Sequence, residues 1–324
     1  MLTDLHEPAL WEHTSSLVEP GDFDEFWRAT LAEARRFDDA PTLTQVDGPL
    51  RTVEVHDVTF PGFGGDPVRA WLRRPAGTTD RLPTVVQYVG YGGGRGNPLD
   101  GLLWASAGYA HLQMDTRGQG SAWSTGDTPD PWGTGPQFPG VMTRGIEDPA
   151  TYYYRRLLTD GVRAVDAARL LPGVDPDRVA VVGGSQGGAI ALAAAALADG
   201  VRAVAAHVPF LCDIPRAITI TDDAPFSEVR SYLAVHRGAE ERVLRTLGYV
   251  DGVAMARRAL PPARFSVALM DTIVPPSTVV AAHAAYAGPA ELRVWRYNGH
   301  EAGGIEDDAE TLTFLDRVLG RNLG

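Results

Sequence analysis

The first third of the chain shows the hydrophobic pattern of a helix followed by two strands. Residues 51–60 alternate apolar and polar side chains like a half-buried strand, and residues 68–73 follow as the returning strand after the glycine-rich turn 61–65. We therefore expect an antiparallel pair here. Asp22 or Asp24 can cap the helix that precedes it. The apolar residues of that helix recur at helical spacing: Phe23, Phe26, Trp27, Leu31 and Ala34.

From residue 84 onward, short apolar runs alternate with helical patterns. The predicted strands are 84–90, 109–115, 178–182, 201–208, 264–270 and 291–297. The predicted helices are 99–107, 151–171, 186–198 and 307–319. This alternation predicts an α/β fold with a mostly parallel, doubly wound sheet, antiparallel N-terminal strands and a helical insertion. Sheets of this kind place their chemistry at the carboxyl ends of the strands.

No linker, repeat or low-complexity tract divides the chain, so we expect one domain over residues 1–324. Residues 1–50 form an N-terminal helical extension, and residues 212–260 form a mostly helical insertion outside the sheet. Residues 118–149 are a long loop insertion rich in glycine and proline. Loops of this length without regular structure are usually functional or packed against a partner.

Neither a membrane span nor a secretory signal is expected. Residues 179–198 carry no charge, which approaches the length of a span, but the glycine-rich turn 183–188 inside them would leave backbone groups unpaired in lipid. We interpret this stretch as a buried strand, turn and helix. Residues 1–11 include Asp4 and Glu7 and lack a basic region before an apolar run, which is unlike a secretory signal.

Composition excludes several classes of function. The formal net charge is −12, and all 29 basic residues are arginine. An acidic chain without a basic tract is poorly suited to nucleic acid or to an anionic membrane. The single cysteine, Cys212, excludes an internal disulfide framework and a cysteine-rich metal centre, and it is compatible with a reducing compartment.

The sharpest chemical signal is the G-x-S-x-G pattern around Ser185, at residues 183–187. It follows an apolar strand and opens a helix, which is the context of a nucleophile elbow. Small neighbours let the strand and helix approach, and the helix N-terminus favours developing negative charge. A phosphate-binding turn is the alternative, but it would need G-x-G-x-x-G or a Walker lysine, and neither is present.

A serine hydroxyl needs a base, and in α/β-hydrolases the acid and the histidine follow the serine in that order. Asp271 ends one strand, and His300 follows the next, so we predict His300 as the general base and Asp271 as the residue that orients it. His207 also ends a strand and is the competing histidine. Asp115 ends a strand too, but it precedes the serine, which is the wrong order.

Acyl transfer also needs backbone N–H groups directed at the oxyanion. We predict the N–H of Gln186, directly after the serine, and that of Tyr91 in the glycine-rich loop 90–94. The alternative for this loop is a simple turn. Its density of glycines beside a strand end favours close backbone approach to a ligand.

Several motifs, in order along the chain, resemble the acetyl xylan esterase and cephalosporin-C deacetylase family, which is carbohydrate esterase family seven. The motifs are Met114-Asp-Thr-Arg-Gly-Gln-Gly120, the elbow 183–188 and His300-Glu301. Similarity continues through residues 22–27, 148–156, 208–212 and 269–271 and so covers nearly the whole chain. The resemblance implies an α/β-hydrolase fold and removal of acetyl groups from acetylated xylo-oligosaccharides and cephalosporin C. It also implies a cytoplasmic homohexamer whose active sites face an inner cavity.

The same resemblance assigns the roles of individual residues. It implies the triad Ser185, Asp271 and His300, and oxyanion donors at Tyr91 and Gln186. It further implies that Tyr91, Phe210, Pro225 and Ile273 bind substrate, that Arg117 and Gln119 brace a loop under the site, and that no cofactor is needed.

Two positions depart from the family's pattern. Gly92 and Gly93 follow Tyr91 where the family often carries asparagine, and His207 stands where an acid is common. Both could shift substrate preference. The competing functional hypotheses are a serine peptidase or other acyl hydrolase of the same fold, and a non-catalytic binding protein that retains this fold.

Overall fold

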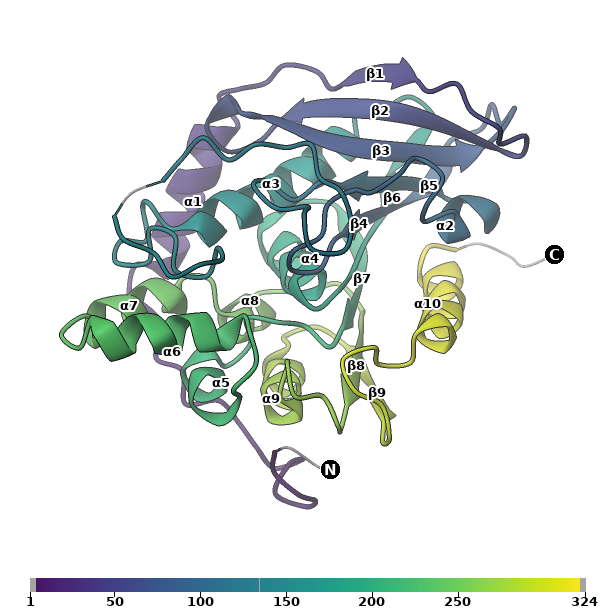
Figure 1. Ribbon diagram of the computed structural model, residues 1–324. Coiled ribbons are helices and arrows are strands. Elements are labelled where there is room, and N and C mark those ends of the chain that lie inside the picture. The colour runs from purple at the N-terminus through teal and green to yellow at the C-terminus, as the bar shows by residue number, and fades with distance from the viewer. Residues whose placement is uncertain (1–3, 134, 321–324) are drawn as a thin grey trace.

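The computed structural model describes residues 4–133 and 135–320, so expectations for residues 1–3, 134 and 321–324 lie outside it. One nine-stranded sheet runs through the molecule in the order β1-β2-β3-β5-β4-β6-β7-β8-β9 (Figure 1). Strands β1 to β3 are antiparallel to their neighbours, and β5 to β9 form the parallel part with β4 between β5 and β6. The predicted α/β-hydrolase fold with antiparallel N-terminal strands is therefore confirmed.

All strands but β1 agree closely with the hydrophobic runs. They are β1 (Thr42–Gln45), β2 (Val53–Pro61), β3 (Pro67–Pro75), β4 (Leu82–Tyr88), β5 (Ala110–Met114), β6 (Val174–Gly184), β7 (Val201–His207), β8 (Ala263–Ala268) and β9 (Ala290–Trp295). Their central members are apolar on both faces because helices cover both sides of a parallel sheet.

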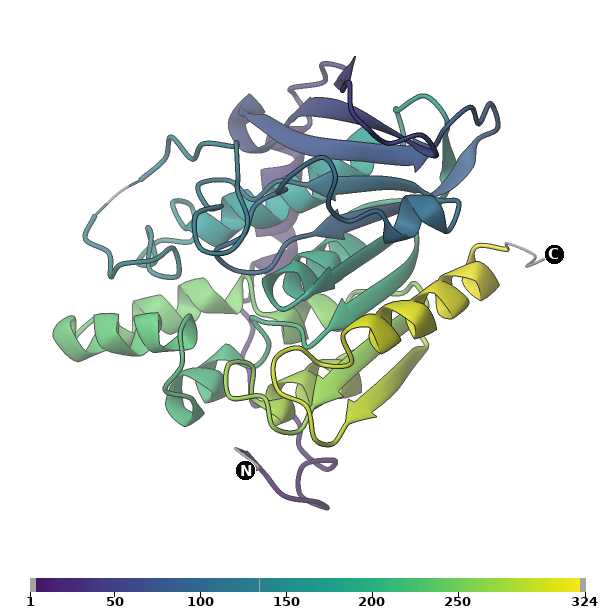
Figure 2. The same cartoon turned by 45° about the vertical axis from the view of Figure 1, so that its right-hand side comes forward.

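Helices flank the sheet on both faces (Figures 1 and 2). They are α1 (Phe23–Ala34), α2 (Leu103–Ser106), α3 (Tyr153–Ala168), α4 (Gln186–Leu197), α5 (Ile214–Ile220), α6 (Phe226–Val235), α7 (Glu240–Gly248), α8 (Gly252–Ala256), α9 (Pro276–Ala285) and α10 (Ile305–Val318), with a 3-10 turn at Phe63–Gly65. Helices α5 to α8 form the predicted helical insertion. Helices α2 and α10 cover one face of the sheet, and α3, α4 and α9 cover the other.

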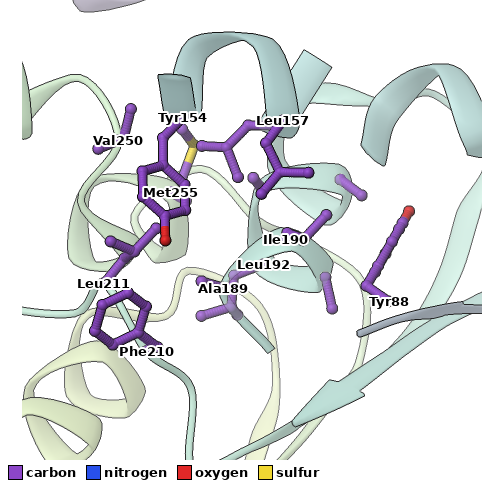
Figure 3. Close-up of a cluster of buried hydrophobic side chains, with 14 of the residues drawn as sticks. Tyr88, Tyr154, Leu157, Ala189, Ile190, Leu192, Phe210, Leu211, Val250 and Met255 are labelled. Atoms are coloured by element: carbon purple, nitrogen blue, oxygen red, sulfur yellow. The ribbon is translucent and has the colours of Figure 1, made fainter. Parts of the chain in front are cut away.

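The largest apolar core lies on the α3 and α4 side of the sheet. Ala189, Ile190 and Leu192 of α4 meet Tyr154 and Leu157 of α3 there (Figure 3). Helix α4 is buried almost all round, which explains why its sequence is alanine-rich and has no polar face. This packing fixes the start of α4, where Ser185 lies.

Three local expectations differ from the structure. The helix expected at 99–107 is only α2, because Gly101 adopts a left-handed φ of 63° just before it. Strand β1 was not expected: its short sequence is mostly exposed and lacks an alternating apolar pattern. Asp22 stands at the N-cap of α1, but its carboxylate makes no capping bond and accepts the hydroxyl hydrogen bond of Tyr249 instead.

Residues 118–133 and 135–149 contain neither helix nor strand. Within 4–133 and 135–320, no helix is long and apolar enough to cross a membrane. The division of the chain into one domain with an N-terminal extension and two insertions stays a prediction.

Candidate active site

Ser185 lies at the sharp turn between β6 and α4. Its φ of 53° and ψ of −121° are a strained combination for a residue with a side chain. The turn is held because the Ser185 N–H donates to the His207 carbonyl at 2.9 Å, and the Phe210 N–H donates to the Ser185 carbonyl at 3.0 Å. The predicted nucleophile elbow thus has the backbone conformation that this kind of turn requires.

The glycines on either side of Ser185 are required by close backbone approach. A Cβ on Gly183 would lie 2.2 Å from the carbonyl carbon of Gly187, and a Cβ on Gly187 would lie 2.3 Å from the Tyr88 carbonyl oxygen. Any side chain at these positions would separate β4, β6 and α4. The G-x-S-x-G pattern is therefore explained by packing as well as by chemistry.

The predicted acid and base meet at the ends of β8 and β9. His300 Nδ1 lies 2.8 Å from Asp271 Oδ2. The other oxygen of the fully buried Asp271 accepts the N–H groups of Ile273 and Val274, both at 2.9 Å. A carboxylate accepts only, so His300 donates from Nδ1 and leaves Nε2 as the free basic nitrogen.

One cavity of about 650 Å³ is lined by Ser185 and His300 together with Tyr91. This volume is typical of small-molecule sites. His300 is about 30% exposed, whereas Asp271 is closed off from solvent behind it. The structure therefore brings the predicted nucleophile and base to one cavity and places the predicted acid behind the base.

The two predicted oxyanion donors are connected through Gln119. The Gln119 side-chain oxygen accepts the N–H of Gly92 at 2.6 Å, and its NH₂ group donates to the side-chain oxygen of Gln186 at 2.9 Å. Among the described residues, the backbone N–H groups of Tyr91 and Gln186 donate to no other protein group. Both amides are thus free to bind a ligand, and their assignment as oxyanion donors stays a prediction.

The Tyr91 side chain ties this loop to the helical insertion. Its hydroxyl donates to Glu228 of α6 at 2.7 Å and accepts the N–H of Val141 at 2.8 Å, and Glu228 also accepts the N–H of Met142 at 3.1 Å. Burial raises the pKa of Glu228, although the bonds from Tyr91 and Met142 oppose the shift. Glu228 was not predicted as part of the site, because its sequence position in a helix gives no local signal.

The predicted acyl-pocket residues divide into two groups. Pro225 and Ile273 line the cavity. Phe210 is fully buried, its ring is 4.4 Å from that of Phe226, and it lies in the apolar cluster of Figure 3 rather than in the cavity wall. A role of these residues in binding the acyl group stays a prediction.

His207 has a setting different from that of His300. Its Nε2 lies 3.1 Å from the Thr311 hydroxyl, and its Nδ1 is 3.9 Å from the carboxylate of Asp307 in α10. Burial lowers its pKa, and Asp307 offsets this only in part. The carboxylate nearest to a ring nitrogen of His207 is thus farther away, at 3.9 Å, than the Asp271 carboxylate is from His300, at 2.8 Å.

Arg117 and its neighbours form a buried ion cluster between the 118–149 loop and α3. Arg117 donates to Asp160 at 2.8 Å, and Arg156 donates to Asp130 at 2.8 Å. Burial by itself would lower the pKa of the Arg117 guanidinium. Nearby carboxylates outweigh this effect and raise the pKa; they belong to Asp160, Asp66 and Asp130. Arg117 thus braces the chain segment that carries Gln119, as the sequence led us to expect.

Several cavity residues were not predicted, among them Trp123, Gln87, Gln113 and Asp308. The Trp123 indole N–H donates to the Tyr91 carbonyl at 2.8 Å. A Cβ on Gly93 would lie 2.3 Å from the Trp123 ring, so the unusual glycine after Gly92 makes room for this indole. Within the described part of the chain, no group of three or more His, Cys, Asp or Glu side chains could hold a metal ion.

The family model described as acetyl xylan esterase (AXE1) matches residues 1–318. The acetyl xylan esterase from Paenibacillus sp. R4 is 36% identical, with a TM-score of 0.91 over 97% of this chain and 100% of that chain. Acetyl xylan esterase 1 from Thermoanaerobacterium sp. JW/SL YS485 is 32% identical, with a TM-score of 0.88 over 96% and 99% of the two chains.

A curated relative, the acetyl esterase Axe7A of Xylanibacter ruminicola, is 27% identical over 297 residues. The match covers 87% of this chain and 63% of that protein, so this chain spans less than two thirds of the relative's length.

Proposed function

The chain belongs to the acetyl xylan esterase family, and from this premise we propose that it is a serine carboxylesterase that releases acetate from small esters. The proposed substrates are acetylated xylo-oligosaccharides and cephalosporin C. The proposed reaction passes through an acetyl-serine and uses no cofactor.

In the proposed mechanism, His300 Nε2 takes the proton of the Ser185 hydroxyl while its oxygen attacks the acetyl carbonyl. The tetrahedral intermediate collapses, the ester C–O bond breaks, and His300 returns the proton to the departing alcohol. A water molecule, deprotonated by His300, then hydrolyses the acetyl-serine to acetate and free Ser185. Asp271 holds the imidazole in the tautomer that leaves Nε2 free and stabilises its protonated form.

The backbone N–H groups of Tyr91 and Gln186 bind the oxyanion in this scheme. Each such donor contributes about 10²–10³ in rate. Gln119 supports the proposal because it joins the segments that carry both donors. Phe210, Pro225 and Ile273 are proposed to limit the acyl group to a small size, with Phe210 acting from behind the wall.

The observation that carries the proposal is the His300–Asp271 contact of 2.8 Å at the cavity that Ser185 also lines. The chain order of Ser185, Asp271 and His300, the strained backbone of Ser185 and the His300–Asp271 hydrogen bond support acyl transfer through serine. A binding protein without catalysis would have no need of these features together.

The test is an acetate-release screen over acetylated xylo-oligosaccharides, cephalosporin C and esters of longer acyl chains. We expect acetyl esters to be preferred and the Ser185→Ala variant to lose the activity. An aminoacyl-nitroanilide serves as the peptidase control and is expected to remain uncleaved. Rates that rise with acyl length would contradict the small acyl pocket, and cleavage of the nitroanilide in preference to acetyl esters would contradict the esterase assignment.

We also propose that the protein is a homo-oligomer, a hexamer by family resemblance, and that it acts in the cytoplasm. The exposed Trp132 and Phe138 of the 118–149 loop support a contact between subunits through this loop. The buried free thiol of Cys212 is compatible with a reducing compartment. Light scattering coupled to size-exclusion chromatography measures the oligomeric state, and a monomer in solution would contradict the hexamer.

A further inference from the structure

The catalytic cavity is lined by Ser185 and extends to residues of β4, β5 and α10. Helices α2 and α10 cover this face of the sheet (Figure 2). The lining of the cavity there is polar. Gln87 of β4, Gln113 of β5, His207 of β7 and Asp308 of α10 form what we call the polar lobe. All four are half-buried, and the proposed acyl-transfer steps use none of them.

The amide of Gln87 is held in one orientation by its neighbours. Its oxygen accepts the indole N–H of Trp104 at 3.2 Å and faces His111 Nε2 at 2.8 Å. An indole N–H can only donate, so the amide oxygen must lie on that side. The NH₂ group of Gln87 is therefore fixed on the opposite side, and among the described residues it donates to no protein acceptor.

Gln113 is oriented in the same way by a different partner. Its side-chain oxygen accepts from Arg73 Nη1 at 2.8 Å, and a guanidinium has donors only. Arg73 is itself fully buried and is anchored by the carbonyls of Asn97 and Pro98. The Gln113 NH₂ group is thus also without an acceptor in the described part of the chain, and the residue lines the cavity.

Asp308 adds an acceptor to these two donors. Within the described ranges, its carboxylate accepts no hydrogen bond, although the neighbouring Asp307 is bonded to Trp295 and Arg264. Beside His207, whose Nε2 lies 3.1 Å from the Thr311 hydroxyl, the polar lobe therefore presents two fixed NH₂ donors and one carboxylate acceptor. None of these atoms is sealed from solvent, so a ligand in the cavity can reach them.

A molecule with several hydroxyl groups matches this set, because each hydroxyl can both accept from an amide and donate to a carboxylate. The Asp308 carboxylate disfavours an anionic ligand by like-charge repulsion. The exposed Trp123 indole offers an apolar surface in the same cavity for the C–H face of a sugar ring. We propose that the polar lobe binds the hydroxyl groups of a neutral sugar, which is the alcohol part of the acetylated xylo-oligosaccharides in the proposed function.

This inference rests on the proposed esterase, so its test compares two acetyl esters. One is an acetylated xylo-oligosaccharide, and the other is ethyl acetate, whose alcohol is too small to reach the lobe. Gln113→Glu keeps an oxygen for Arg73 and replaces the NH₂ donor by a second oxygen. We expect the ratio of kcat/KM for the sugar ester to that for ethyl acetate to fall about tenfold, through KM.

The matched control is Gln45→Glu, the same substitution at an exposed position of β1 outside this cavity. It is expected to leave both rates unchanged. An equal loss on both esters in Gln113→Glu would overturn the proposal, since a structural role would not distinguish the alcohol part. No acetate release from either ester by the wild-type protein would instead contradict the proposed function.

A second variant guards against a Gln113→Glu protein that fails to fold. Asp308→Asn removes the negative charge and keeps the size, so we expect cephalosporin C, which is anionic, to gain about threefold or more relative to the neutral sugar ester. An unchanged preference would contradict the role of Asp308. Xylotriose titrated calorimetrically into the Ser185→Ala protein supplies a readout free of catalysis: binding is expected, and its absence would overturn the proposal.

Discussion

Two polar regions of the molecule differ in how their hydrogen bonds are satisfied. Around Arg117 and Asp160, charged side chains are fully buried and paired with one another. In the polar lobe, Gln87, Gln113 and Asp308 are half-buried and keep unpaired atoms at a cavity. The difference teaches that polar groups satisfied within the protein stabilise the fold, whereas those left open are available to a ligand.

Two buried carboxylates of the candidate site are both hydrogen-bonded but have different partners. Asp271 is bonded to the base His300, and Glu228 is bonded to the Tyr91 side chain. In the proposed mechanism the first acts on the group that moves a proton, and the second acts on the position of a loop. Substitutions in the two regions should therefore affect different measurements.

The largest effect is expected at Ser185. Ser185→Ala removes the nucleophile, so we expect kcat to fall by at least about 10⁴, which corresponds to about 5.5 kcal/mol. Ser227→Ala, a similarly half-buried serine outside the cavity, is the control. Acetate release is measured for both variants, with thermal unfolding to show that each is folded. A Ser185→Ala protein that kept a tenth of the wild-type kcat would contradict the assignment of Ser185 as the nucleophile.

The next effect is on stability. Asp160→Asn leaves the buried Arg117 without its main counter-charge, and we expect the free energy of unfolding to fall by about 3–5 kcal/mol. Asp222→Asn removes one partner of an exposed pair with Arg230 and is expected to change it by less than about 1 kcal/mol. Denaturant unfolding followed by tryptophan fluorescence measures both. Equal losses would show that burial does not distinguish the two pairs.

A smaller effect is expected at Gly93, which packs against the cavity residue Trp123. Gly93→Ala places a methyl group where the Trp123 ring lies, so the indole must move and its bond to the Tyr91 carbonyl is lost. We expect kcat/KM for acetyl esters to fall about tenfold, or about 1.4 kcal/mol. At Gly21 an added Cβ meets nothing within 4 Å, so Gly21→Ala is the matched control. Equal activity of both variants would contradict a role for the indole.

The smallest effect concerns pH. Burial, together with Asp307, raises the pKa of Asp308 to about 6 from 3.8. The unfolded chain then loses this proton at lower pH than the folded chain, so the contribution of Asp308 to the stability of the folded protein falls as pH rises from about 4 to about 6. Asp308→Asn cannot titrate.

We therefore expect the Tm of Asp308→Asn minus that of the wild-type protein to increase over this pH range and to stay constant above it. The change corresponds to less than about 1 kcal/mol after solvent screening. Thermal scans at pH 4, 5, 6 and 7 measure it. A difference in Tm that is constant over all four pH values would contradict the shift.

The sequence predicts the fold well because its signals are local, and the candidate site residues are found by the same signals. Each strand of the parallel sheet is an apolar run, and Ser185, Asp271 and His300 each follow such a run. The order serine, acid, histidine along the chain then favours His300 over His207, which precedes Asp271. Strand β1 could not be predicted in this way because it is an exposed edge strand with a mostly polar sequence.

The polar lobe could not be predicted because its properties depend on contacts between distant segments. Nothing near Gln113 in the sequence indicates that Arg73 will hold its amide oxygen. Gln87 likewise depends on Trp104, which lies on α2. A glutamine within an apolar strand is compatible with several settings, and only the packed structure decides which atoms reach the cavity.

The most direct test of the account is labelling by a fluorophosphonate probe, followed by peptide mass spectrometry. The probe reacts with a serine hydroxyl that a neighbouring base has activated. We predict a single adduct on Ser185 in the wild-type protein and loss of that adduct in His300→Ala. Labelling of another residue, or a Ser185 adduct that forms equally fast without the His300 imidazole, would contradict the claim that these two side chains act together.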